Sequence, residues 1–155
     1  MMTLAFFLDA NCVNARQKND ALNQLESYRD RNMVTLMYAD KVHAEARHGS
    51  QKRSDKVQEF SFAELDPVFG ENLEVKGQIE DILCPGGAKT ANERNDIWAV
   101  YVAERLQWPL VTMDGASKSQ PGGILGRAPQ LAALGVEVIT PQQALDRVRA
   151  AEHAV

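Results

Sequence analysis

Two short apolar runs, far apart in the chain, each lead to an aspartate. Thr3–Leu8 (TLAFFL) runs directly into Asp9, and Leu110–Thr112 (LVT) is followed, one residue later, by Asp114. Neither run alternates between apolar and polar residues, so each is expected to be a strand that is buried on both faces. Strands of this kind belong to parallel sheets that helices cover on both sides. This pattern constrains the fold more than any other feature of the sequence.

Helix and strand signals alternate along the rest of the chain. We predict further strands over Met33–Met37 and Val136–Ile139, and helices over about 13–29, over Ala91–Gln107, before Gly135 and from Thr140. The segment over 60–87 has no clear period, and short helices and turns are expected there. The order predicts an α/β fold, a three-layer α/β/α arrangement with a central parallel sheet. We expect a single domain over 1–148, followed by a C-terminal tail over 149–155.

Composition narrows the class of protein. The chain has 155 residues, of which 45% are hydrophobic, enough for one buried core. No apolar run approaches the length of a membrane span, and the start lacks a basic region before its short apolar stretch, so we expect a cytoplasmic protein without a membrane partner. The net charge of −4 argues against binding nucleic acid by charge alone. It leaves room for a nuclease whose acidic site is compensated by bound cations.

Four acids are candidates for one site. Asp9 and Asp114 follow strands, and ligands of an open parallel sheet bind beyond the carboxyl ends of its strands. Asp96 heads an apolar stripe that continues through Val100 and Ala103, where a charged residue is out of place. Glu45 lies just beyond the second strand-like run. If the strands are neighbours, these carboxylates converge at one edge of the sheet.

Converging carboxylates repel one another unless a cation lies between them. Hard oxygen ligands suit Mg²⁺ or Mn²⁺, and such a site can activate water for attack on a phosphodiester. Each acid also has a purely structural explanation: Asp9 and Asp114 as turn residues, Asp96 as an acid near a helix N-terminus, and Glu45 as a partner of Lys41. The coincidence of all four favours a metal site.

The sequence resembles the PIN-domain family over nearly its whole length. FLDANCV is similar to the family's first strand, and MVTLMYADKVHAEA to its second strand and the helix that bears a glutamate. NDIWAVYVAERLQWPLVTMD is similar to the helix–proline–strand unit, and LAALGVEVITPQQALDRV to the last strand and helix. The loop after Asp114, GASKSQPGG, departs from the family, which often has an aromatic residue there.

This resemblance implies a metal-dependent endoribonuclease of the kind found as toxins in toxin–antitoxin pairs. It implies an Mg²⁺ or Mn²⁺ site, with Asn11 and Thr112 in supporting roles, and hydrolysis of RNA by a metal-activated water. The implied metal ligands are the four acids Asp9, Glu45, Asp96 and Asp114. The alternative is a PIN-like module that binds RNA or a protein without cleaving.

The sequence also indicates which binding partners to expect. Cations near the predicted site, Lys41, Arg94 and Lys118, are candidates for contact with the RNA substrate. We expect a homodimer and consider an antitoxin protein as a further partner. Apolar residues of the middle segment are candidates for such an interface, or for covering the core: Phe60, Phe62, Val68, Phe69 and Leu73.

Overall fold

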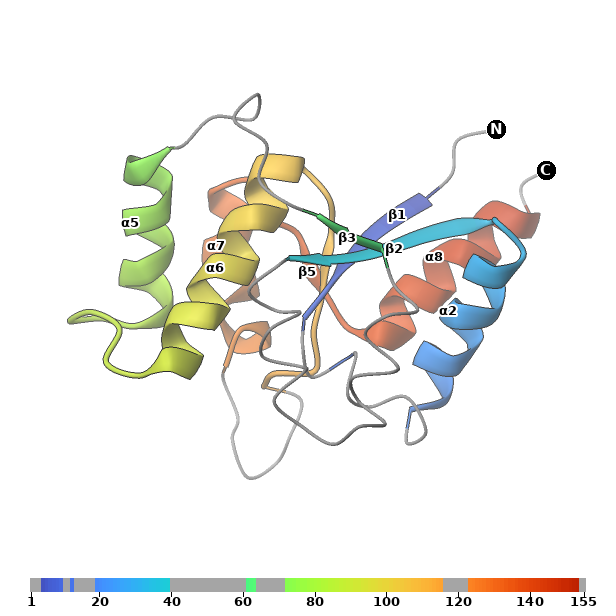
Figure 1. Cartoon of the computed structure of the whole chain (residues 1–155), viewed down its shortest axis with the longest axis horizontal. Helices are drawn as coiled ribbons and strands as arrows, with labels where there is room; N and C mark the ends of the chain where they lie inside the picture. The colour runs from blue at the N-terminus through green and yellow to red at the C-terminus, as the bar shows by residue number, and fades with distance from the viewer. Residues whose placement is uncertain are drawn as a thin grey trace.

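The computed structural model describes residues 4–9, 12, 19–39, 61–63, 72–115 and 123–153. Within these ranges, five strands form one sheet in the order β3-β2-β1-β4-β5, and all neighbours are parallel (Figure 1). The strands are β1 (Leu4–Leu8), β2 (Val34–Ala39), β3 (Ser61–Ala63), β4 (Leu110–Val111) and β5 (Val138–Ile139). The predicted parallel α/β fold is confirmed.

Helices cover both faces of this sheet. They are α2 (Asp20–Asp30), α5 (Leu73–Leu83), α6 (Ala91–Leu106), α7 (Ala128–Ala133) and α8 (Pro141–His153), with a 3-10 turn, η2 (Leu125–Arg127). Figure 1 shows α2 and α8 together on one side of the sheet, and α5, α6 and α7 on the other. No helix in the described part of the chain is long and apolar enough to cross a lipid bilayer.

Side-chain caps fix where the helices begin. Thr140 accepts a hydrogen bond from the amide of Gln143, whose side chain accepts in turn from the Thr140 amide, as the capping-box pattern predicts. Thr90 caps α6 in the same way through the amide of Glu93. Asn19 has extended backbone and caps α2 through the amide of Leu22. A helix continuous from 13 to 29 is therefore wrong, because Asn19 has extended backbone and α2 begins only at Asp20.

Two further predictions need correction or extension. The segment over 60–87 contains a strand, β3, and the helix α5 in addition to turns. The last helix runs to His153, beyond residue 149, where we expected a tail to begin. Its end contacts α2, because the Tyr28 hydroxyl donates to Glu152 Oε2 at 2.7 Å.

The order of the strands indicates where this sheet is expected to bind a ligand. From β1 the chain adds β2 and β3 on one side of it, and later β4 and β5 on the other side. Open parallel sheets bind ligands where the strand order reverses in this way, beyond the carboxyl ends of the two central strands. Leu8 pairs with Val111 in the register of β1 and β4. The residues that follow them, Asp9 and Thr112, therefore stand side by side at this switch point.

Candidate metal centre

Asp9 is a buried carboxylate at the end of β1. Its amide donates to the carbonyl of Val111 at 3.0 Å, which continues the β1–β4 ladder by one residue. Only 4% of Asp9 is exposed, while Phe6, Phe7 and Leu8 before it are buried in the core. The strand thus carries an acid to the edge of the apolar interior, where burial is costly for a charge.

Thr112 links two of the predicted acids. Its hydroxyl donates to Asp9 Oδ2 at 2.9 Å and accepts from the amide of Asp114 at 3.1 Å. Its own amide donates to the carbonyl of Ile139 at 3.1 Å, so β5 holds its backbone in place. A fully buried hydroxyl with both a donor and an acceptor role fixes the relative positions of the two aspartates. The family resemblance implies a supporting role for Thr112, and that role stays a prediction.

Asp114 is held by main-chain atoms of residues that come about ten positions later in the chain. The Ile124 amide donates to Asp114 Oδ2 at 3.0 Å, and the Leu125 amide donates to the Asp114 carbonyl at 3.0 Å. Gly123 has φ +49°, and a Cβ there would lie 2.7 Å from Asp114 Cγ. Only glycine admits this approach without strain.

Sequence reasoning missed Gly123 and Ile124. The only signal was the glycine pair in GASKSQPGG, which indicates a turn but does not reveal which side chain the turn approaches. The contact is between residues that the loop brings together, and no local pattern encodes it.

Asp96 lies near the start of α6. The helix precedes β4 and runs antiparallel to it, so its N-terminal end lies at the same edge as Asp9. Asp96 is half-buried and stands at the head of the stripe formed by Val100 and Ala103, which are buried against the sheet. The partial burial of Asp96 is compatible with its predicted position on this side of the helix, and its role in a site stays a prediction.

Burial and nearby carboxylates raise the pKa of both cysteine thiols. Burial and then the negative charge of Asp9 raise the pKa of the Cys12 thiol, which also donates to the Val111 carbonyl at 3.4 Å. Burial, a hydrogen bond with Glu93, and the charges of Glu93, Asp96 and Glu80 raise the pKa of Cys84 to about 11. Both thiols are therefore protonated at neutral pH, and neither is activated as a nucleophile or a soft metal ligand.

The described residues include only some of the predicted metal ligands. Asp9 and Asp114 are joined through Thr112, and Asp96 lies at the same edge, but no three His, Cys, Asp or Glu side chains among the described residues are close enough to hold one ion. The other predicted contributors, Glu45, Asn11, Lys41 and Lys118, lie outside the described residues. Arg94 is exposed on α6. The oxygens that are present, from carboxylates and a hydroxyl, are of the kind that Mg²⁺ and Mn²⁺ prefer.

Comparison with known proteins tests the fold. No protein-family model matches the chain, and no curated protein matches it either. Among solved structures, a chain in the crystal structure of VapBC2 from Rickettsia felis, bound to a DNA fragment from their promoter, matches with a TM-score of 0.56 and 17% sequence identity. The match covers 88% of this chain and 98% of that one. The chain has a PIN-like fold.

The PIN-like fold and the residues at the switch point rest on separate observations. The fold that the sequence resemblance predicts is confirmed over most of the chain, at an identity that shows the fold alone. The residues at the switch point of this chain, Asp9, Thr112 and Asp114, come from its own sequence and contacts. The fold does not establish what these residues do, so their function is inferred from the arrangement of their oxygen atoms.

Proposed function

We propose that the chain is a divalent-metal-dependent endoribonuclease, and the toxin of a toxin–antitoxin pair. The observation that carries the proposal is the buried carboxylate of Asp9, tied through the Thr112 hydroxyl to Asp114 at the switch point of a parallel sheet. The PIN-like fold supports the same activity, and its resemblance to a chain of VapBC2 supports the toxin assignment.

The proposed metal ligands are Asp9, Asp96, Asp114 and Glu45, with Asn11 in support. A bound Mg²⁺ or Mn²⁺ would supply a lowered pKa for a coordinated water and positive charge beside the phosphate. Thr112 holds Asp9 and the Asp114 backbone in fixed relation, and the Ile124 amide orients the carboxylate of Asp114. The chain's own task is thus to hold preorganised oxygens in a partly buried crevice, so that little reorganisation is needed during the reaction.

The test is cleavage of end-labelled single-stranded RNAs in the presence of Mg²⁺ or Mn²⁺. Asp9→Asn and Asp96→Asn remove one charge each with almost no change in volume. Asp146→Asn is the matched control, because Asp146 is exposed on α8 and accepts a hydrogen bond from Gln142 on the same helix. We expect cleavage by the wild type and the control, and a loss of about a thousandfold in the other two variants, equal to ~4 kcal/mol of barrier. Equal activity in all four proteins would overturn the proposal.

A further inference from the structure

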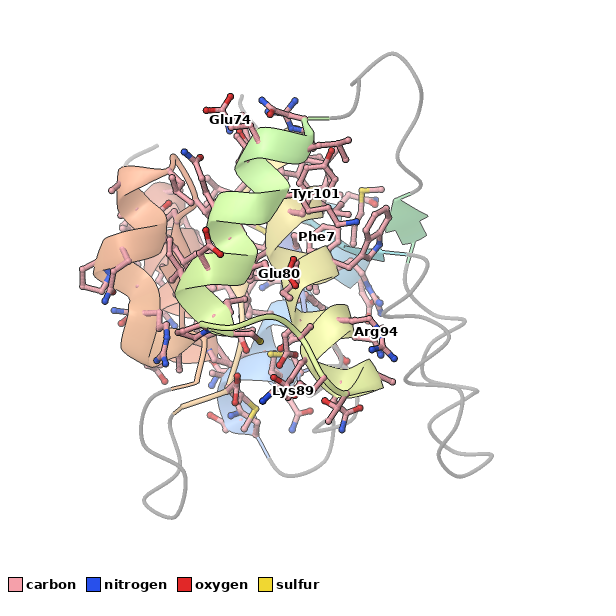
Figure 2. All side chains as sticks on the ribbon, turned by 90° about the vertical axis from the view of Figure 1, so that its left-hand side faces the viewer. Phe7, Glu74, Glu80, Lys89, Arg94 and Tyr101 are labelled. Atoms are coloured by element: carbon pink, nitrogen blue, oxygen red, sulfur yellow. The ribbon has the colours of Figure 1, made fainter. Side chains whose placement is uncertain are left out.

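A hollow of about 200 Å³ lies between α5 and α6, away from the switch point. Figure 2 faces these two helices and shows Glu80 between them and Arg94 on α6. The residues that line the hollow are Lys76, Glu80, Ala88, Arg94, Ile97 and Trp98. Its volume is below the roughly 300–1,000 Å³ typical of sites for drug-sized ligands, so it suits one small planar group rather than a helix of a partner.

The charges in this hollow favour an anion. Lys76 and Arg94 make no ion pair with any carboxylate in the part of the chain that the structure describes. The one acid, Glu80, is held by the backbone, because its Oε1 accepts from the Ala88 amide at 3.1 Å. Two cations against one carboxylate leave the hollow positive, in a chain whose net charge is −4.

An aromatic ring accompanies these cations. The Lys76 ammonium lies 5.4 Å from the centroid of the Trp98 ring and 5.9 Å from that of Tyr101, as in cation–π contacts. Trp98 is mostly buried but lines the hollow, and Tyr101 is fully buried. Sites for single-stranded nucleic acids combine these two elements, cations for the backbone and an aromatic side chain for a base.

The geometry of α6 connects the hollow to the proposed cleavage site. Arg94, Trp98 and Tyr101 follow one another at helical spacing along the face that contacts α5. Asp96 is on the opposite face, in the stripe that packs toward the sheet. Because a helix with its side chains is about 10–12 Å across, the two faces lie within reach of neighbouring nucleotides on one strand.

We infer that the hollow between α5 and α6 binds one nucleotide of a single-stranded RNA substrate, outside the nucleotides at the scissile bond. Lys76 and Arg94 contact its phosphate, and Trp98 provides a surface for its base. The inference rests on the proposed ribonuclease function, and it concerns where the substrate strand runs after it leaves the acidic crevice. An acidic peptide offers the same charge but no aromatic base, so the aromatic wall favours RNA.

Binding is measured by fluorescence anisotropy of a labelled single-stranded RNA, in the Asp96→Asn background with Mg²⁺ to prevent cleavage. We expect the double variant Lys76→Ala/Arg94→Ala to raise the dissociation constant roughly tenfold. We also expect a smaller salt dependence: the slope of the logarithm of the association constant against the logarithm of the salt concentration should fall in magnitude by about 1.4, or about 0.7 for each lost phosphate contact. The control pair is Arg31→Ala/Arg149→Ala, which removes the same charge from α8 and from the end of α2, on the other side of the sheet. It should leave the slope unchanged.

A second measurement tests the base contact. In a Trp108→Phe background, Trp98 is the only tryptophan, because the chain has two. RNA should quench its emission, and inorganic triphosphate at a saturating concentration should quench it much less, because it carries no base. Hexaglutamate peptide serves as the competing acidic probe and should not displace RNA at concentrations well above that of the RNA.

The outcomes separate the two proposals. Equal affinity and salt slope in the Lys76/Arg94 variant and the control would overturn the inference, while cleavage by the wild type would still stand. Displacement of RNA from Trp98 by hexaglutamate would also overturn it, in favour of an acidic peptide site. If the wild type neither binds nor cleaves RNA, both proposals fail. A melting temperature within about 3 °C of the parent for each variant confirms that the comparison is between folded proteins.

Discussion

Polar groups at the carboxyl edge of β1 and β4 differ from those in the α2–α8 layer. At the edge, Asp9 is 4% exposed and Thr112 is fully buried, and each serves as a partner of the other. In the helical layer, Arg147 of α8 pairs with Glu137, the residue before β5, and their side chains are 40% and 52% exposed. Both regions contain hydrogen-bonded polar groups, but only one of them removes a carboxylate from water.

The polar contacts of the two regions therefore differ in their effect on stability. An exposed ion pair changes stability little and costs little to form. A buried carboxylate has a desolvation cost that an apolar residue in its place would avoid. The chain keeps Asp9 at such a position, at the edge where its fold binds ligands, so the edge is better explained by function than by stability.

Among substitutions that leave the carboxylates in place, the largest effect is expected from Thr112→Val, which keeps the shape of the side chain and removes its hydroxyl. Asp9 Oδ2 loses a donor and the Asp114 amide loses an acceptor, so the two aspartates are no longer fixed relative to each other. We expect RNA cleavage to fall by about 10–100-fold, as for groups that orient metal ligands. Thr112→Ser retains the hydroxyl and should recover most of the activity. If valine and serine give the same rate, the hydroxyl does not act through the aspartates.

Gly123→Ala tests whether the loop backbone must approach Asp114. Gly135 is the matched control, since it also has a positive φ, +88°, but a Cβ there would meet nothing within 4 Å. Both substitutions introduce an unfavourable backbone conformation, at about 1 kcal/mol each. Only Gly123→Ala places a methyl group against the carboxyl group of Asp114. We expect similar losses of stability by chemical denaturation and about a tenfold loss of cleavage for Gly123→Ala alone. Equal rates would show that Asp114 tolerates displacement.

The smallest effect belongs to the exposed pair. The hydrogen bond from Arg147 lowers the pKa of the Glu137 carboxyl below its ordinary value. The stabilisation is therefore fully present above the unfolded-state pKa of about 4.3 and is lost as the pH falls through the lower folded-state pKa. We expect Arg147→Ala to reduce the free energy of unfolding by less than about 1 kcal/mol at pH 7, and by less still at pH 3. A difference that grows toward acid pH, in denaturant titrations, would contradict this sign.

Local signals made the fold readable from the sequence. The unbroken apolar run before Asp9 predicts a doubly covered strand, and the Thr140 capping box marks the start of α8. The middle segment was not readable, because β3 is a three-residue strand whose identity depends on pairing with β2. A strand this short has no internal pattern, and only the neighbouring strand makes it part of the sheet.

The site was predictable where it depends on strand ends and unpredictable where it depends on a loop. Asp9 and Thr112 meet because β1 and β4 are parallel neighbours. We expected the acids to converge only if these strands were neighbours. The contact of Ile124 with Asp114 joins residues ten positions apart, across a stretch of sequence that has no periodicity. The hollow on α6 was missed as a unit because Lys76 comes from another helix, although Arg94 itself was a candidate for substrate binding.

The central claim is that the carboxylates at the switch point bind a divalent ion, and a melting-temperature titration with Mn²⁺ tests it most directly. A ligand of the folded state at a hundred times its dissociation constant adds about 2.7 kcal/mol of stability, or about 5–10 °C in a chain of this size. We predict this rise for the wild type and Asp146→Asn, and its loss in Asp9→Asn and Asp114→Asn. The same rise in all four proteins, or in none of them, would contradict the claim.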